Sequence, residues 1–159
     1  MLIKKIIIGI DNSKFAEHAA KYGFDIAHKF NAAVGLVNIV EPAIMPYNNN
    51  DVILGSTVQN MGAADMDLIT IQNEVSENLI ADTIKKFGGD LKITHFSEFG
   101  NTADGIINCS KEFKADMIVI GTHSRTGLDR LIMGSVAEHV VRHSDVPVLV
   151  VPFKESESQ

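Results

Sequence analysis

A short β-branched run near the start of the chain limits the folds that it can adopt. The run, Ile6-Ile7-Ile8-Gly9-Ile10, has no polar alternation. Strands covered on both faces have this pattern, whereas strands with one solvated face alternate polar and apolar residues. The run stops at Asp11-Asn12-Ser13, residue types that form turns and helix caps. The sequence therefore predicts a buried strand followed directly by a helix.

The same strand-and-helix pattern recurs along the chain. Residues 91–96 alternate polar and apolar, as expected for a strand near a sheet edge. We expect further strands at 34–40, 91–96, 117–120 and 148–151, and helices at about 14–30, 68–87, 102–113 and 135–143. Strands that alternate with helices predict an α/β fold, with a single five-stranded parallel sheet and helices on both faces.

Local signals mark several boundaries of these elements. Asn31 is the expected end of the first helix, and Asn101 or Thr102 the expected cap of the third. Residues 41 to about 64 contain two prolines and three consecutive asparagines, and are predicted to form a long loop. Apolar residues at 68, 71, 75, 79 and 87 indicate a long helix that ends at Gly88-Gly89.

Length and charge narrow the class of protein. The chain has 159 residues, which fits one domain at 1–153 with a solvated C-terminal tail at 154–159. Its net charge of −6 disfavours nucleic acid as a main partner. The single cysteine, Cys109, excludes an internal disulfide and is expected to be buried in a helix. Because no run approaches a membrane span, we expect no membrane partner and a cytoplasmic location.

The segment after the fourth predicted strand is the strongest candidate site. Ligands of parallel sheets bind beyond the carboxyl ends of the strands. The segment reads GTHSRTGLDRLIMG from Gly121 to Gly134 and has a local charge of +1 on a protein of −6. It ends in Gly134-Ser135-Val136 at a helix start, where free N–H groups and the helix dipole favour an anion. Alternatively, Ser135 and Glu138 have the spacing of a capping box that occupies those N–H groups. The spacing alone leaves both interpretations open.

Other motifs of catalysis or metal binding are absent from the sequence. It contains no G-x-x-x-x-G-K-[ST] loop, no G-x-G-x-x-G after the first strand and no G-x-S-x-G elbow. A single cysteine and scattered histidines disfavour a zinc site. Asp11 could act as a base, but an aspartate just past a strand is more often a turn or cap residue. No nucleophile is paired with a base.

Four segments of the chain resemble the universal stress protein family: 6–13, 115–123, 134–140 and 146–151. The last two read GSVAEHV and VPVLVV. The resemblance implies the strand order 3-2-1-4-5 of the adenine nucleotide alpha hydrolase-like fold. It also implies a homodimer formed through the last strand, Val148–Val151. That apolar edge would otherwise be open to uncontrolled pairing.

The nucleotide-binding branch of this family has a spaced glycine motif. It consists of glycine, two residues, glycine, nine residues, then glycine and serine or threonine. Gly121, Gly134 and Ser135 match it, and Ser124 stands where the second glycine would be. We expect binding to be retained but weakened, because a left-handed conformation at Ser124 would cost about 1–2 kcal/mol. By position, the resemblance implies a pocket formed by Gly9, Ile10, Asp11, Ile39, Ile120, Gly121, His123, Ser124, Gly134, Ser135 and Val136.

Together these features predict a homodimeric stress-response protein that binds ATP or another adenine nucleotide, with Mg²⁺ as an optional companion. Its expected role is regulatory rather than catalytic. Two alternatives remain open at this point: a weak ATP hydrolase or phosphotransferase, and a dimeric interaction module without nucleotide. The sequence does not name the downstream protein partner.

Overall fold

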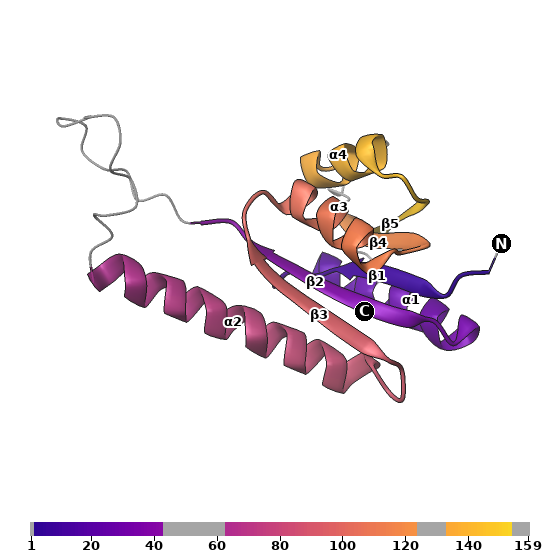
Figure 1. The fold of residues 1–159 in the computed structure, drawn as a ribbon, viewed down its shortest axis with the longest axis horizontal. Coiled ribbons are helices and arrows are strands. Elements are labelled where there is room, and N and C mark those ends of the chain that lie inside the picture. Colours follow the sequence, from indigo (N-terminus) through magenta and orange to yellow (C-terminus); the bar gives the residue numbers. More distant parts are fainter. Residues whose placement is uncertain (1, 43–62, 124–132, 154–159) are drawn as a thin grey trace.

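The computed structural model describes residues 2–42, 63–123 and 133–153. Within them, five strands form one parallel sheet in the order β3-β2-β1-β4-β5 (Figure 1). The fold and the strand order predicted from the sequence are therefore confirmed. The strands are β1 (Lys5–Gly9), β2 (Ala33–Val40), β3 (Ile93–Phe99), β4 (Met117–His123) and β5 (Val148–Phe153). The helices are α1 (Lys14–Phe30), α2 (Ala63–Phe87), α3 (Thr102–Phe113) and α4 (Ser135–His143).

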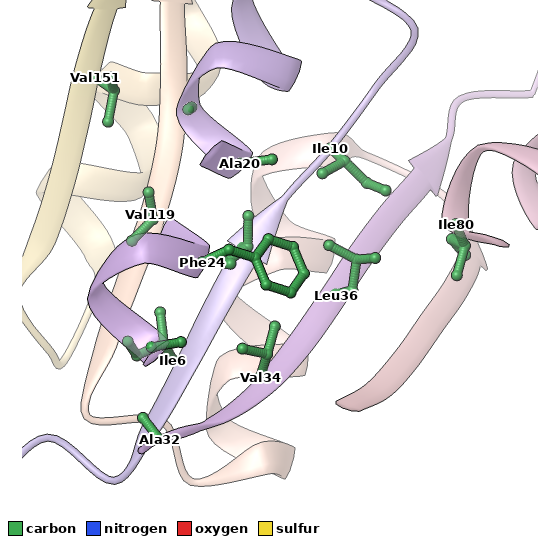
Figure 2. Packing of buried hydrophobic residues seen from close by; sticks show 13 residues of the cluster. Ile6, Ile10, Ala20, Phe24, Ala32, Val34, Leu36, Ile80, Val119 and Val151 are labelled. Carbon is green, nitrogen blue, oxygen red and sulfur yellow. The ribbon is translucent and has the colours of Figure 1, made fainter. Parts of the chain in front are cut away.

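The central strand β1 is buried on both faces, as its unbroken β-branched run predicts. Ile6 and Ile8 belong to the core cluster beneath α1 and α2, whereas Ile7 belongs to the cluster beneath α3 and α4. Figure 2 shows the first cluster, in which the ring of Phe24 from α1 lies over the strands. All three isoleucines are 0% exposed. Because both faces of β1 are apolar, this strand requires helices that cover both faces of the sheet.

The ends of α1 follow the residues predicted for them. The Ser13 hydroxyl accepts a hydrogen bond from the Ala16 N–H at 3.1 Å, as an N-cap does. Asn31 ends the helix with φ 52° and ψ 44°, in the left-handed region that asparagine tolerates better than most residues. Both predictions are confirmed. Ser13 and Asn31 thus set the points at which the chain leaves the sheet after β1 and returns to it before β2.

The long helix α2 packs with only part of the face that its apolar residues indicate, because Leu79 and Phe87 pack against the core but Ile71 and Val75 do not. Ile71 and Val75 are 56% and 45% exposed, whereas Ser76 is only 2% exposed. The Ser76 hydroxyl bonds the Asn38 side chain on β2 at 2.7 Å, and it lies 2.7 Å from the Ser97 hydroxyl on β3. The face toward the sheet is partly polar, so hydrophobic spacing reveals only part of it.

Cys109 on α3 is 1% exposed, which confirms its predicted burial. Desolvation, followed by the nearby carboxylate of Glu98, raises the pKa of its thiol from 9.0 to about 12. A thiol with so high a pKa is a poor nucleophile near neutral pH. Cys109 therefore serves packing.

Among the described residues, no helix is long and apolar enough to cross a bilayer.

Candidate functional site

A cleft of about 330 Å³ opens at the carboxyl ends of β1 and β4. The start of α4 borders it, together with residues from the starts of α1 and α3. This is where ligands of open parallel sheets bind. The predicted residues that line it are Gly9, Ile10, Asp11, Ile39, Ile120, Gly121, Gly134, Ser135 and Val136. His123 is the last residue of β4, and Ser124 lies outside the described residues.

The start of α4 carries no side-chain cap in the described structure. Gly134 is the N-cap, with φ −61° and ψ 159°, and has no side chain that could bond the first turn. The Thr122 hydroxyl accepts from the N–H of Gly134 itself, at 3.3 Å. The carboxylate of Glu138 instead accepts a bond from the Arg142 guanidinium at 2.8 Å. The capping box considered from the sequence is therefore wrong. Helix starts leave their first N–H groups without helical partners, so the amides of Ser135, Val136 and Ala137 can meet an anion in the cleft.

Two glycines of the cleft differ in what a side chain at their position would meet. A Cβ at Gly121 would lie 2.6 Å from the carbonyl oxygen of Phe15, so glycine there lets the start of α1 pack against β4. A Cβ at Gly134 would meet no atom of the described residues within 4 Å, and the φ of Gly134 is ordinary. Neither packing nor backbone conformation explains the glycine at 134, but its small size leaves room beside the helix start.

One wall of the cleft is apolar and comes from three isoleucines. Ile106 and Ile120 are each 4% exposed, and Ile39 completes the wall from the end of β2. Gly9 keeps the wall flat, because a Cβ there would lie 3.2 Å from Ile120 and 3.3 Å from Ile106. A smooth apolar surface of this kind suits a planar ring system.

Two carboxylates lie at the polar side of the cleft. One oxygen of Asp11 accepts a bond from the Ser13 N–H at 2.7 Å, so Asp11 forms the turn that leads into α1. Oε1 of Glu41 accepts bonds from the Thr102 hydroxyl at 2.8 Å and the Thr102 N–H at 3.4 Å. Glu41 and Thr102 were not predicted as site residues. No local pattern joins them, since they meet only when β2 and α3 are assembled.

A buried polar chain holds the cleft residue Ile10 in place. Its N–H donates to the Val37 carbonyl at 2.8 Å, and its carbonyl accepts from the Asn38 amide at 2.9 Å. Asn38 is 8% exposed and is held in turn by Ser76 on α2. Both backbone groups of Ile10 are thus bonded to the neighbouring strand, which fixes the floor of the cleft before any ligand arrives.

The arrangement suits binding of an elongated ligand with an apolar ring, polar hydroxyl or amine groups, and an anionic end. The ring would lie on the isoleucine wall, the polar groups beside Asp11 and Glu41, and the anion at the start of α4. Among the described residues, no group of three or more His, Cys, Asp or Glu side chains gathers as a metal site.

This combination of a doubly wound sheet and an open helix start at its carboxyl edge defines a class of small α/β ligand-binding proteins. The family model described as the universal stress protein family matches residues 2–152. A universal stress protein of Methanocaldococcus jannaschii is 32% identical over 156 residues, covering 97% of this chain and 86% of that protein. The chain belongs to the universal stress protein family.

Solved structures agree with this family fold. Universal stress protein UspA from Lactobacillus plantarum superposes with a TM-score of 0.73 at 16% identity, covering 95% of this chain and 99% of that one. A universal stress protein in complex with cAMP gives a TM-score of 0.62 at 21% identity, with 95% and 98% coverage. A family member from Arabidopsis thaliana with AMP bound gives 0.63 at 14% identity, with 98% and 96% coverage.

Proposed function

We propose that this protein binds an adenine nucleotide, with ATP as the leading candidate, and acts as a regulatory stress-response protein. The observation that carries the proposal is the open start of α4, where Gly134 leaves empty space beside uncapped N–H groups. Helix starts of this kind bind phosphate through their amides and dipole. Two structural neighbours contain AMP or cAMP, which supports an adenine nucleotide in this cleft.

The described residues fit the three parts of such a ligand. The adenine ring would lie against Ile39, Ile106 and Ile120, with Asp11 at its polar side. Gly121 and Gly134-Ser135-Val136 would surround the phosphates. The volume of about 330 Å³ falls at the lower end of the usual range for small-molecule sites, about 300–1,000 Å³. We include His123 and Ser124 in the proposed site because of their positions in the family motif.

A cytoplasmic homodimer joined through β5 is part of the same proposal. In the described structure β5 is an edge strand, and its Val148–Val151 segment is apolar. Pairing of this edge with a second copy would cover it in a controlled way. In a regulatory protein of this kind, nucleotide binding would change the surface offered to partner proteins.

Isothermal titration with ATP, ADP, AMP and cAMP tests the nucleotide proposal. We expect saturable binding of at least one of them, together with a rise in the unfolding temperature at excess nucleotide. An absence of both heat and thermal shift for all four would overturn the proposal and favour an interaction module without nucleotide.

A variant of Gly134 tests the proposed pose. Gly134→Val should keep the fold, because no atom of the described residues lies within 4 Å of its Cβ position and φ is −61°. Its side chain would fill the space beside the helix start, and we expect at least a tenfold loss of ATP affinity. Val141→Ala is the matched control, because Val141 lies on the same helix and is 44% exposed. This variant should leave ATP affinity unchanged. Unchanged affinity in a folded Gly134→Val protein would contradict the pose.

A further inference from the structure

Glu41 is held at the rim of the cleft in a way that leaves half of its carboxylate available. Oε1 accepts both bonds from Thr102, whereas Oε2 accepts none from the described residues. The side chain is exposed and lines the cleft. Because Thr102 is the first residue of α3, the dipole of that helix favours the negative charge at this place. The contacts therefore orient Glu41 without satisfying it.

The position of Glu41 relates it to one end of the proposed ligand. Glu41 directly follows β2, while the open start of α4 follows β4, and β1 lies between these two strands. A nucleotide with its phosphates at α4 and its base on the isoleucine wall would present its nucleoside end toward β2. A carboxylate only accepts hydrogen bonds, so it can pair there only with a donor.

We propose that Glu41 is a specificity-determining residue that selects ligands with a hydrogen-bond donor on the nucleoside. The inference rests on the proposed nucleotide site and names the chemistry that the site requires. Adenosine has two sources of such a donor, the ribose hydroxyls and the exocyclic amine of adenine. A ligand with a carbonyl oxygen in place of the amine would meet the carboxylate as one acceptor against another.

Two sets of ATP analogues distinguish the two donors. The first set, 2′-deoxy-ATP and 3′-deoxy-ATP, removes one ribose hydroxyl at a time. The second, ITP, replaces the adenine amine with a carbonyl oxygen. In the unaltered protein we expect about a tenfold lower affinity for the analogue that lacks the donor facing Glu41, because a bond to a charged group is worth more than a neutral one.

The variant Glu41→Gln isolates the carboxylate with little change in shape. Its carbonyl oxygen can still accept from Thr102, and its NH₂ group replaces Oε2 as a donor. We expect this variant to discriminate between ATP and the sensitive analogue by no more than about twofold. If the adenine amine is the partner, the variant should bind ITP at least as tightly as ATP. Glu112→Gln removes the same charge at the far end of α3 and should retain the discrimination of the unaltered protein.

The outcomes separate this inference from the function on which it rests. Loss of discrimination in Glu41→Gln but not in Glu112→Gln, for either analogue set, supports the inference and identifies the donor. If both proteins bind ATP and Glu41→Gln discriminates against the analogues as strongly as the unaltered protein does, the inference about Glu41 is overturned while the proposed nucleotide binding stands. The same follows if the unaltered protein binds ATP no more tightly than any of the analogues. An absence of ATP binding in the unaltered protein overturns the proposed function first.

Discussion

Of the helices that begin at the cleft, α3 and α4 differ in how their first N–H groups are bonded. At α3, the Asn101 side chain accepts from the Asp104 N–H at 3.0 Å, and Glu41 accepts from the Thr102 N–H at 3.4 Å. At α4, Gly134 occupies the cap position and no side chain of the described structure bonds the first turn. Both helix starts carry the positive end of a helix dipole, but only the start of α4 leaves its N–H groups available to a ligand.

This difference shows how a fold can use one physical feature for two purposes. A helix start with a polar cap contributes to stability, typically by about 1 kcal/mol. A start with glycine as the N-cap gives up only a few tenths of a kcal/mol of that contribution and leaves its N–H groups for a ligand. We infer that the pair sets the polarity of the cleft, with α4 facing the anionic end of the ligand and α3 the nucleoside end. Four variants test this comparison, from the largest expected effect to the smallest.

Gly134→Asp would make the start of α4 resemble that of α3. Aspartate is a preferred N-cap residue, so stability should be unchanged or rise by a few tenths of a kcal/mol relative to glycine. Its carboxylate would occupy the anion position and repel phosphate. At about 4 Å and an effective dielectric of 20, that repulsion amounts to about 4 kcal/mol before screening. We expect at least a 100-fold loss of ATP affinity by titration.

The neutral variant Gly134→Asn separates charge from size at this position. Asparagine caps a helix about as well as aspartate but adds no charge. Its ATP affinity should fall between that of Gly134→Asp and that of the unaltered protein, and the gap between the two variants should narrow at high salt. Equal affinity of all three proteins would show that the phosphates do not lie at α4.

Asn101→Ala breaks the capped start instead. Loss of the bond to the Asp104 N–H should destabilise the protein by about 1 kcal/mol, which lowers the unfolding temperature by about 2–4 °C for a chain of this size. ATP affinity should stay within about twofold, because this helix start does not face the phosphates. Asn101→Ser, which restores a capping oxygen, should recover most of the stability. A tenfold loss of affinity would place α3 at the anionic end and contradict the comparison.

Thr122→Val should give the smallest change in free energy, below the change of about 1 kcal/mol expected for the stability of Asn101→Ala. The buried Thr122 hydroxyl accepts from the Gly134 N–H at 3.3 Å, a long and therefore weak bond. Valine has nearly the same shape and releases this N–H. We expect ATP affinity to change by no more than about threefold, with Thr122→Ser as the control that keeps the hydroxyl. A larger loss would indicate that Thr122 orients the start of α4.

The sequence predicts those parts of the fold that depend on local chemistry. The unbroken run Ile6–Ile8, the cap Ser13 and the end residue Asn31 all take the places predicted for them. The third strand begins at Ile93 rather than near Leu91 and extends to Phe99. Its edge position weakens the pattern, because only one of its sides pairs with another strand. The packed face of α2 was predictable only in part: Leu79 and Phe87 pack against the core as their spacing indicates, but Ser76 is buried by polar bonds rather than by hydrophobicity.

The candidate site divides in the same way. Cleft residues at the ends of buried strands, such as Ile10, Ile39 and Gly121, could be placed from the strand pattern and the family motif. Glu41 and Thr102 could not, because their bond joins residues 61 positions apart. The S-x-x-E spacing at Ser135 suggested a capping box, but α4 begins one residue earlier than that motif requires, so that Gly134 rather than Ser135 is the N-cap.

The free space at Gly134 has a consequence for mutational surveys of this protein. A survey that scores variants by the amount of folded protein should tolerate most residues at 134 while rejecting side chains at Gly121, where a Cβ would meet the backbone at 2.6 Å. A second survey that retains only nucleotide-bound molecules should reject both. The functional importance of position 134 would then be visible only when the two surveys are compared, because the amount of folded protein alone does not depend on the residue there.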